Sequence, residues 1–284
     1  MNRNGGFLMK IIVDSSSLYS SLEGRKQKIK VLPVRVNFNG KSYKDYDDIS
    51  TDEMISHIVQ GAIPKSSQPA VGEVMQVFER TNDEILAFSI GDGLSGTYSN
   101  FVGAKNSTEN NERIHVVDTK TLAGAYHYIV EKAIQLRDSG LNIQQIKDTL
   151  QDSINHCWSY VIPTNFTFLK RSGRLSPLAA NAAGFMKIVP SLTLSEDKRK
   201  IELLTMTRTV KKAIDEIIKN MKANGVNDEY EISVSHAGVT ERAKETIQQL
   251  KETFTNASFR LFELSPSLVL HGGPGCIVIQ AIKK

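Results

Sequence analysis

The chain of 284 residues contains only two cysteines, Cys157 and Cys276, and each lies among apolar neighbours. Two isolated cysteines provide neither the disulfide framework of a small secreted domain nor a Cys-x-x-Cys or Cys/His spacing typical of a metal site. We therefore expect two small buried thiols in a reduced compartment, and no bound metal.

Long apolar runs are also absent, because glycine and proline interrupt the longest uncharged stretches. No segment offers the roughly 20 apolar residues that cross a bilayer. The N-terminal stretch MNRNGGFL is too short and too polar for a secretory signal peptide. We interpret residues 1–8 as an N-terminal extension, expect the first structured segment to begin at Met9, and expect a cytoplasmic protein without a transmembrane segment.

The chain has little net charge, +4, which is too small to indicate a nucleic-acid partner. The charge is nevertheless uneven. Ten basic and three acidic residues lie between Lys170 and Lys212, so this basic window carries +7 and the rest of the chain −3. A solvated surface explains such a window most simply, and a docking surface for an acidic partner is the alternative interpretation.

The composition, 40% hydrophobic and 23% charged, is typical of a folded globular chain of one or two domains. Short apolar segments alternate with segments that have apolar residues at helical spacing. This alternation predicts βαβ units and a largely parallel sheet with flanking helices. The expected strands are 10–14, 32–38, 84–89, 114–118 and 160–163, and the expected helices are 51–62, 71–80, 97–105, 121–138 and 143–155.

The pattern changes near residue 164, where a basic turn and an alanine-rich helix appear. The turn SEDKRK then joins two strand-like segments and predicts a hairpin. We therefore expect two α/β domains, 9–163 and 164–284, with a mixed sheet in the second and a ligand site between them. The expected C-terminal strands are 187–194, 201–206, 231–235, 259–264 and 276–282, and the expected helices are 210–224 and 240–254.

Four loops rich in hydroxyl and glycine residues follow predicted strands: VDSSS, KSSQP, GDGLSGTYS and HGGPG. In open α/β sheets, ligands bind at the carboxyl ends of the strands. Hydroxyl groups and the N–H groups at the start of a helix suit a carboxylate or phosphate. The simpler interpretation is that Ser66 and Ser95 are ordinary helix caps.

The stretch LVLHGGPGCIVI places His271 and a glycine run between two segments that look like core strands. A histidine satisfied within a loop is the simpler interpretation. Three glycines around one proline, however, make room for a ligand or for a neighbouring backbone.

Two other functions would use the same residues. A serine hydrolase could combine Ser95 with His271, but the local sequence does not match Gly-x-Ser-x-Gly and no acidic residue is evidently placed to orient the histidine. A phosphocarrier could use His271 or His236, but no nucleotide-binding Gly-x-x-x-x-Gly-Lys-[Ser/Thr] loop is present.

The motifs KSSQP, LSGTY, VVDTKTLA, LKRSGRLS, FMKIVPSL, SHAG and SPSLVLHGGPG occur in the order found in the DegV family of bacterial lipid-binding proteins, which the chain resembles from Met9 onward. Each motif is weak alone, and their order carries the resemblance. It implies two α/β domains that hold a long-chain fatty acid, such as palmitate, between them. Some members resemble the fatty-acid-carrying subunit of a bacterial fatty acid kinase, which presents the carboxylate to a separate ATP-using subunit.

The resemblance further implies a lipid-binding protein of fatty acid metabolism rather than an enzyme, without a catalytic residue or cofactor, and we expect it to be a monomer. The residues that match the family's motifs divide into two groups. The carboxylate would lie near Ser66, Ser95, Gly96, Thr97, His271 and Gly272, whereas Arg171, Arg174 and Arg208 would line the entrance or dock the partner. Two departures are Ser66, where threonine is usual, and the acidic Asp92 within SIGDGLSG.

Overall fold

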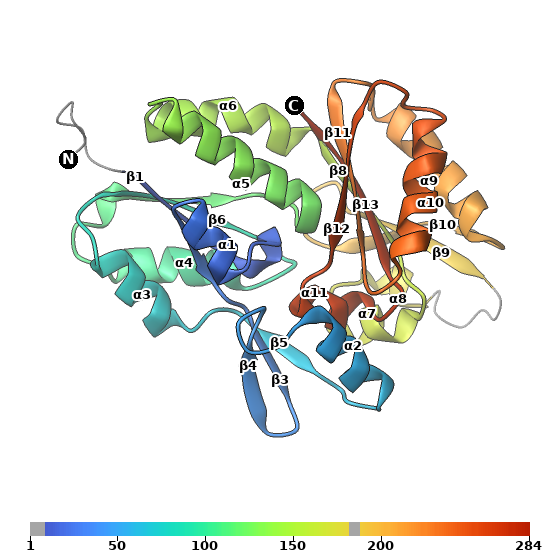
Figure 1. Ribbon diagram of the computed structural model, residues 1–284, viewed down its shortest axis with the longest axis horizontal. Coiled ribbons are helices and arrows are strands. Elements are labelled where there is room, and N and C mark those ends of the chain that lie inside the picture. The colour runs from blue at the N-terminus through green and yellow to red at the C-terminus, as the bar shows by residue number, and fades with distance from the viewer. Residues whose placement is uncertain (1–8, 182–187) are drawn as a thin grey trace.

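The computed structural model describes residues 9–181 and 188–284 (Figure 1). The expected extension at residues 1–8 and the start of the FMKIVPSL motif, residues 185–187, lie outside the described residues. The strands are β1 (Met9–Asp14), β2 (Ile29–Leu32), β3 (Arg35–Phe38), β4 (Lys41–Lys44), β5 (Lys65–Ser67), β6 (Glu84–Ser89), β7 (Ile114–Asp118), β8 (Cys157–Ile162), β9 (Val189–Leu194), β10 (Ile201–Thr207), β11 (Tyr230–His236), β12 (Ser258–Glu263) and β13 (Ile277–Lys283). The helices are α1 (Ser21–Lys26), α2 (Thr51–Val59), α3 (Val71–Glu79), α4 (Thr97–Asn106), α5 (Ala123–Asp138), α6 (Ile143–Asn155), α7 (Phe166–Ser172), α8 (Pro177–Asn181), α9 (Val210–Ala223), α10 (Thr240–Lys251) and α11 (Pro266–Gly272).

The first sheet has the strand order β2-β1-β6-β7, and all of its strand pairs are parallel. Successive side chains of β1 point to opposite faces, as the strand period of two requires. Ile11 joins the core formed with Tyr126 of α5, whereas Ile12 joins Phe78 of α3 and Phe101 of α4. The predicted parallel sheet with flanking helices is therefore confirmed.

The second sheet has the order β10-β9-β8-β13-β11-β12. Strand β13 is antiparallel to β8 and β11, whereas β11 and β12 are parallel, so the predicted mixed sheet is confirmed. The predicted hairpin is the antiparallel pair β9 and β10. Strand β8 belongs to this sheet, so a domain boundary between residues 163 and 164 falls just after one of its strands. That boundary stays a prediction.

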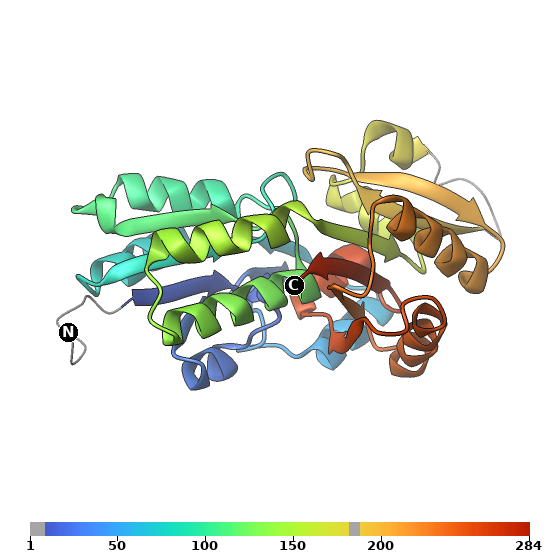
Figure 2. The ribbon, with the colours of Figure 1, turned by 90° about the horizontal axis from the view of Figure 1, so that it is seen from above.

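Helices cover both faces of the second sheet (Figures 1 and 2). On one face, Ile214 of α9 and Leu250 of α10 pack against Ile279 of β13. On the other face lie α5 and α6, and the Gln280 side chain of β13 accepts a hydrogen bond from the Ala125 N–H of α5 at 3.1 Å. Helix α5 therefore packs against both sheets and joins the two halves of the molecule.

A small antiparallel sheet, β4-β3-β5, projects from the first half and carries Ser66 in β5. The sequence predicted one strand over 32–38, which is wrong: β2 ends at Leu32 and β3 begins at Arg35 in a different sheet. Pro33 stands at the break, where its missing N–H cannot continue the hydrogen-bonded ladder.

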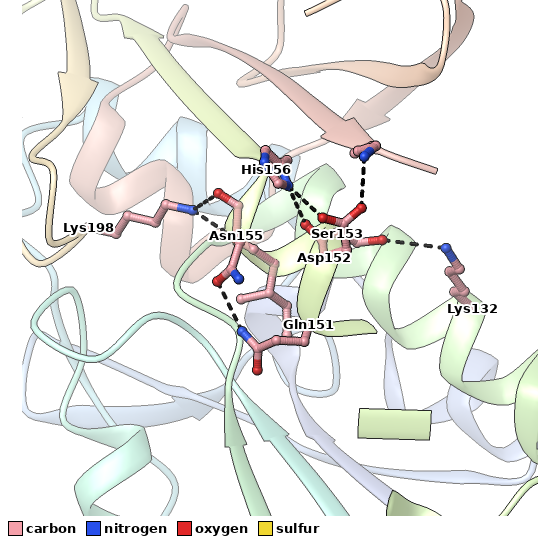
Figure 3. Close-up of polar contacts among 9 residues, drawn as sticks. Lys132, Gln151, Asp152, Ser153, Asn155, His156 and Lys198 are labelled. Atoms are coloured by element: carbon pink, nitrogen blue, oxygen red, sulfur yellow. Dashed lines mark hydrogen bonds and ion pairs between the residues drawn. The ribbon is translucent and has the colours of Figure 1, made fainter. Parts of the chain in front are cut away.

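The end of α6 is fixed by side chains from the second half, as Figure 3 shows. The Lys198 ammonium, in the β9–β10 turn, donates to the carbonyls of Ile154 and Asn155 at 2.8 and 3.1 Å. Asp152 forms ion pairs with His156 at 2.8 Å and with Lys283 at 2.9 Å. Part of the basic window therefore caps a helix terminus, where a cation is favourable.

Both cysteines, Cys157 and Cys276, are buried and free, as expected. Among the described residues, no helix is both long and apolar enough to cross a bilayer.

Candidate functional site

A cavity of about 350 Å³ lies where β5, α7 and α11 meet. It contains four of the residues singled out in the sequence: Ser66, His271, Arg171 and Arg174. Its other lining residues are Ile63, Pro64, Lys65, Phe168, Ser172 and Leu270. The wall thus combines hydroxyl, imidazole and cationic groups with apolar side chains.

His271 stands in the last turn of helix α11, and not between two strands as its apolar flanks suggested. The stretch before it is helical because Ser265 caps the helix by accepting from Leu268 N–H, and Pro266 occupies the first turn. A short apolar run fits a buried helix as well as a strand, and here the Ser-Pro start signal decides. Helix α11 brings the imidazole to the wall of the cavity.

Ser66 and His271 are hydrogen-bonded partners: Ser66 Oγ lies 2.8 Å from His271 Nε2, across 205 residues of sequence. Burial in the protein, together with the nearby positive charge of Arg174, lowers the pKa of His271 to about 3. The imidazole is therefore neutral near pH 7. A neutral imidazole has one N–H donor, and the bond between the two side chains uses either that N–H or the Ser66 O–H, so the bonded pair presents one remaining donor to an anion.

The two arginines of the cavity are held differently. The Arg174 Nε donates to the Leu94 carbonyl at 3.0 Å, and the same guanidinium also donates to the Ser172 carbonyl. Burial lowers the pKa of Arg174. The Arg171 guanidinium lies 5.0 Å from the centre of the Phe168 ring, a cation–π distance, and the residue is exposed. Arg174 is thus fixed near the histidine, whereas Arg171 stands at the exposed side.

The glycine run after His271 makes room for α7. Gly273 has a positive φ of 81°, and a Cβ there would approach Phe168 Cδ2 to 2.4 Å. Only glycine adopts this conformation readily and also permits the contact. The run that suggested space for a ligand therefore accommodates, at this position, the aromatic ring that lines the cavity.

Ser95 and Thr97 form a local pair beside the cavity. Ser95 Oγ lies 2.9 Å from Thr97 Oγ1 and accepts from Thr97 N–H at 3.3 Å. Ser95, Gly96 and Thr97 are not among the residues that line the cavity. The loop is nevertheless close, because Arg174 binds the Leu94 carbonyl and a Cβ on Gly96 would meet Gln68 at 2.4 Å.

Two further predicted residues also lie outside the cavity lining. Gly272 is buried, and a Cβ there would approach the Cys276 sulfur to 2.7 Å. Arg208 is exposed between β10 and α9. The acidic Asp92, a departure from the family's pattern, forms an ion pair with Arg199, so the basic window supplies its counter-charge.

Some features of the site were not predicted. Phe168 lines the cavity but lies outside the motifs, and Lys65 and Leu270 line it although neither was singled out within its motif. Asp45 binds the start of α11 from another part of the sequence, through Ser267 N–H at 2.9 Å and Ser267 Oγ–H at 2.7 Å. No local spacing indicates such contacts. Within residues 9–181 and 188–284, no three His, Cys, Asp or Glu side chains are grouped as metal ligands.

The architecture defines a class: an α/β protein of two large sheets and one small one, with a hydroxyl–imidazole pair and two arginines at a cavity between its halves. The family model described as "Uncharacterised protein, DegV family" matches residues 8–284. The chain therefore belongs to the DegV family. It is 28% identical, over 96% of its length and 98% of the relative's, to a DegV domain-containing protein of Staphylococcus aureus strain N315.

Solved structures share this fold. DegV from Bacillus subtilis, described as a fatty acid binding protein, superposes with a TM-score of 0.84 at 22% identity, covering 98% of this chain and 100% of that one. A protein of Eubacterium ventriosum, described as binding stearic acid, gives a TM-score of 0.86 at 22% identity, with coverage of 97% and 98%.

Proposed function

We propose that this protein binds one long-chain fatty acid, such as palmitate, with the carboxylate at the Ser66–His271 pair and the acyl chain between the two halves. The observation that carries the proposal is the 2.8 Å contact between Ser66 and His271 at the wall of a cavity. Structural relatives described as fatty-acid-binding proteins support the ligand class.

The pair suits a carboxylate, since the donor that the Ser66–His271 bond leaves unused can donate to it, and a carboxylate that replaces that bond meets both the hydroxyl and the imidazole N–H. Arg174 adds a positive charge nearby without leaving its own carbonyl partners. Hydrogen bonds to a charged group contribute roughly 1.5–3 kcal/mol each. The pair therefore positions the headgroup without a direct ion pair.

The acyl chain supplies most of the affinity. Burial of a C16 chain is worth roughly 13 kcal/mol at about 0.8 kcal/mol per methylene. Association and ordering oppose this by several kcal/mol or more. Phe168 and Leu270 are the apolar side chains next to the pair, and the tail would begin along them.

The experiment compares palmitate with methyl palmitate on delipidated protein, by calorimetry and by the rise in melting temperature that a ligand of the folded state causes. Ser66→Ala and His271→Gln should weaken palmitate binding by about 10- to 100-fold and methyl palmitate binding much less. Ser67→Ala is the matched control, because Ser67 is exposed on the same strand. Equal losses for both ligands, or no melting shift with any C14–C18 acid, would contradict the proposal.

We further propose that the protein presents the carboxylate to an ATP-using kinase subunit, with Arg171 and Arg174 at the mouth and Arg208 in the docking surface. Arg171 is exposed at the cavity, and arginine suits bidentate phosphate contacts. Arg171→Glu should leave palmitate binding near normal and slow acyl phosphate formation by a partner kinase. Wild-type phosphorylation by this variant would argue against docking at Arg171.

Hydrolysis is less well supported. A general base works best with a pKa near 7, whereas the pKa of His271 is lowered to about 3, and its hydroxyl partner is Ser66 rather than Ser95. A phosphocarrier role for His236 is opposed by burial, because the residue is only 4% exposed.

A further inference from the structure

A second cavity, of about 430 Å³, lies at the other end of the parallel sheet. It is lined by the first residues of β1 and β2 and by the C-terminal end of α3. The candidate fatty-acid site adjoins the loop after the carboxyl end of β6, so the two cavities lie at opposite ends of the strands. In Figure 1, the start of β1 and α3 lie far from α7 and α11.

Five cationic side chains surround this second cavity, and none of its described lining residues is acidic. Lys10 has a counter-charge, since its ammonium lies 3.5 Å from the Asp83 carboxylate. Among the described residues, the other four take part in no ion pair. The five cationic residues are Lys10, Arg25, Lys28, Lys30 and Arg80.

The floor of the cavity is apolar. Ile11, Ile12, Ile29 and Val77 are among its lining residues. The side chains of Ile11 and Ile29 belong to the core on one face of the sheet, and Ile12 and Val77 belong to the core on the other face. Val77 is only partly buried, so it is the apolar side chain that a ligand beside Lys30 and α3 would contact. A concave apolar surface with a few convergent polar groups is the usual form of a small-molecule site. The combination of an apolar floor and a cationic rim selects an anion that also carries an apolar group.

A side chain of α5 holds the backbone of the rim in place. Arg137 of α5 donates to the carbonyls of Gln27 and Lys28 at 3.2 and 3.1 Å, which fixes the turn between α1 and β2. Arg25 belongs to α1, Lys28 to the turn and Lys30 to β2. The backbone that carries these three cationic residues is therefore fixed by contacts within the protein.

Lysines on an edge strand also discourage pairing with another chain, and β2 is an edge strand. That role accounts for Lys30. It does not account for Arg25 and Arg80, which lie in or next to helices α1 and α3 and line the same cavity.

We propose that this second cavity is a binding site for an organic phosphate, an anion with at least two negative charges and an apolar group. The phosphate would lie among Arg25, Lys30 and Arg80, since guanidinium groups form bidentate, charge-assisted hydrogen bonds with phosphate. The apolar group would cover Val77, on the same face of the sheet as Lys30. This site is independent of the fatty-acid site.

Calorimetric titration of the full chain tests the site with three probes: ADP, hexyl phosphate and inorganic diphosphate. At least one organic probe should bind saturably and more tightly than diphosphate, because only the organic probes can cover the apolar floor. Arg25→Glu with Lys30→Glu should weaken that binding by about tenfold or more, and added salt should weaken it further.

Two control variants separate a defined site from diffuse positive charge. Lys26→Glu changes the same turn of α1 at a residue that does not line the cavity, and Arg171→Glu changes the first cavity. Each should alter binding by less than about threefold. Failure of both organic probes to bind, or an equal loss in Lys26→Glu, would overturn the proposal. If the double variant does not fold, Lys30→Gln and probe-induced NMR shifts of the Val77 methyl groups decide the question.

Discussion

Asp45 and Ser267 are hydrogen-bonded although 222 residues separate them in the sequence. Asp45 also accepts from Ser15 Oγ at 2.7 Å, so three donors converge on one buried carboxylate. These contacts join the first half of the chain to the start of α11, the helix that ends at His271. Burial raises the pKa of Asp45, and the hydrogen bonds oppose that rise.

Asp45→Ala should lower the free energy of unfolding by about 1–3 kcal/mol for each buried donor left without a partner. It should also weaken palmitate binding, because α11 would lose its anchor. Denaturant unfolding and calorimetry measure the two effects. Asp47→Ala is the control: this exposed residue accepts only from Ser21 Oγ, and its loss should cost less than about 0.5 kcal/mol. Equal costs would contradict the anchoring role.

The low pKa of His271 should make stability depend on pH. Between the unfolded value near 6.5 and the folded value of about 3, the unfolded chain binds a proton that the folded chain excludes. Stability is therefore lost as the pH falls through this window, by about 1.4 kcal/mol per unit. His271→Gln removes this component, so its stability relative to wild type should improve by about 2 kcal/mol between pH 7 and pH 5. An NMR titration in which His271 gains its proton near pH 6.5 would contradict the expectation.

Gly273→Ala should disturb the cavity through Phe168. The substitution adds a Cβ at positive φ and only 2.4 Å from the ring, so we expect a loss of about 1–3 kcal/mol in stability and weaker palmitate binding. Gly140→Ala is the matched control, because Gly140 has a similar φ of 89° with nothing within 4 Å of the added Cβ. If both variants behave alike in the binding assay, the Phe168 contact is unimportant for the ligand.

Lys198→Met tests the cap on α6. The variant loses both hydrogen bonds to the carbonyls of Ile154 and Asn155, and thermal unfolding should show a loss of about 1–2 kcal/mol. Lys200→Met changes an exposed neighbour in the same turn and should have little effect. Similar losses in both variants would show that overall charge, rather than the cap, matters.

The regular elements could be predicted where local pattern and final environment agree. The strands at 84–89 and 114–118 and the helix at 143–155 are found with their expected bounds. The helix α11 was missed because a buried apolar run has the same local pattern in a helix and in a strand. The pair Ser265 and Pro266 was the one sequence signal that indicated the start of a helix there.

The site could be predicted only in part. Motifs identified Ser66 and His271 as candidates, and the fold brings them together. Their separation of 2.8 Å depends on how β5 and α11 pack against each other. No local sequence pattern predicts that packing, because the two elements are far apart in the chain. The anchor at Asp45 was missed for the same reason, since one of three aspartates in the stretch KDYDD resembles any surface carboxylate in sequence.

The position of β13 has a consequence for biosynthesis. This strand lies between β8 and β11 near the middle of the second sheet, yet it spans residues 277–283. After the strands of the first sheet have been synthesised, the ribosome must still synthesise β13 before β8 and β11 can each pair with it. Until then, β8 and β11 each have an edge whose N–H and C=O groups are unpaired and can form hydrogen bonds with other chains. The nascent protein should therefore depend on chaperones late in translation, after its first half has already folded.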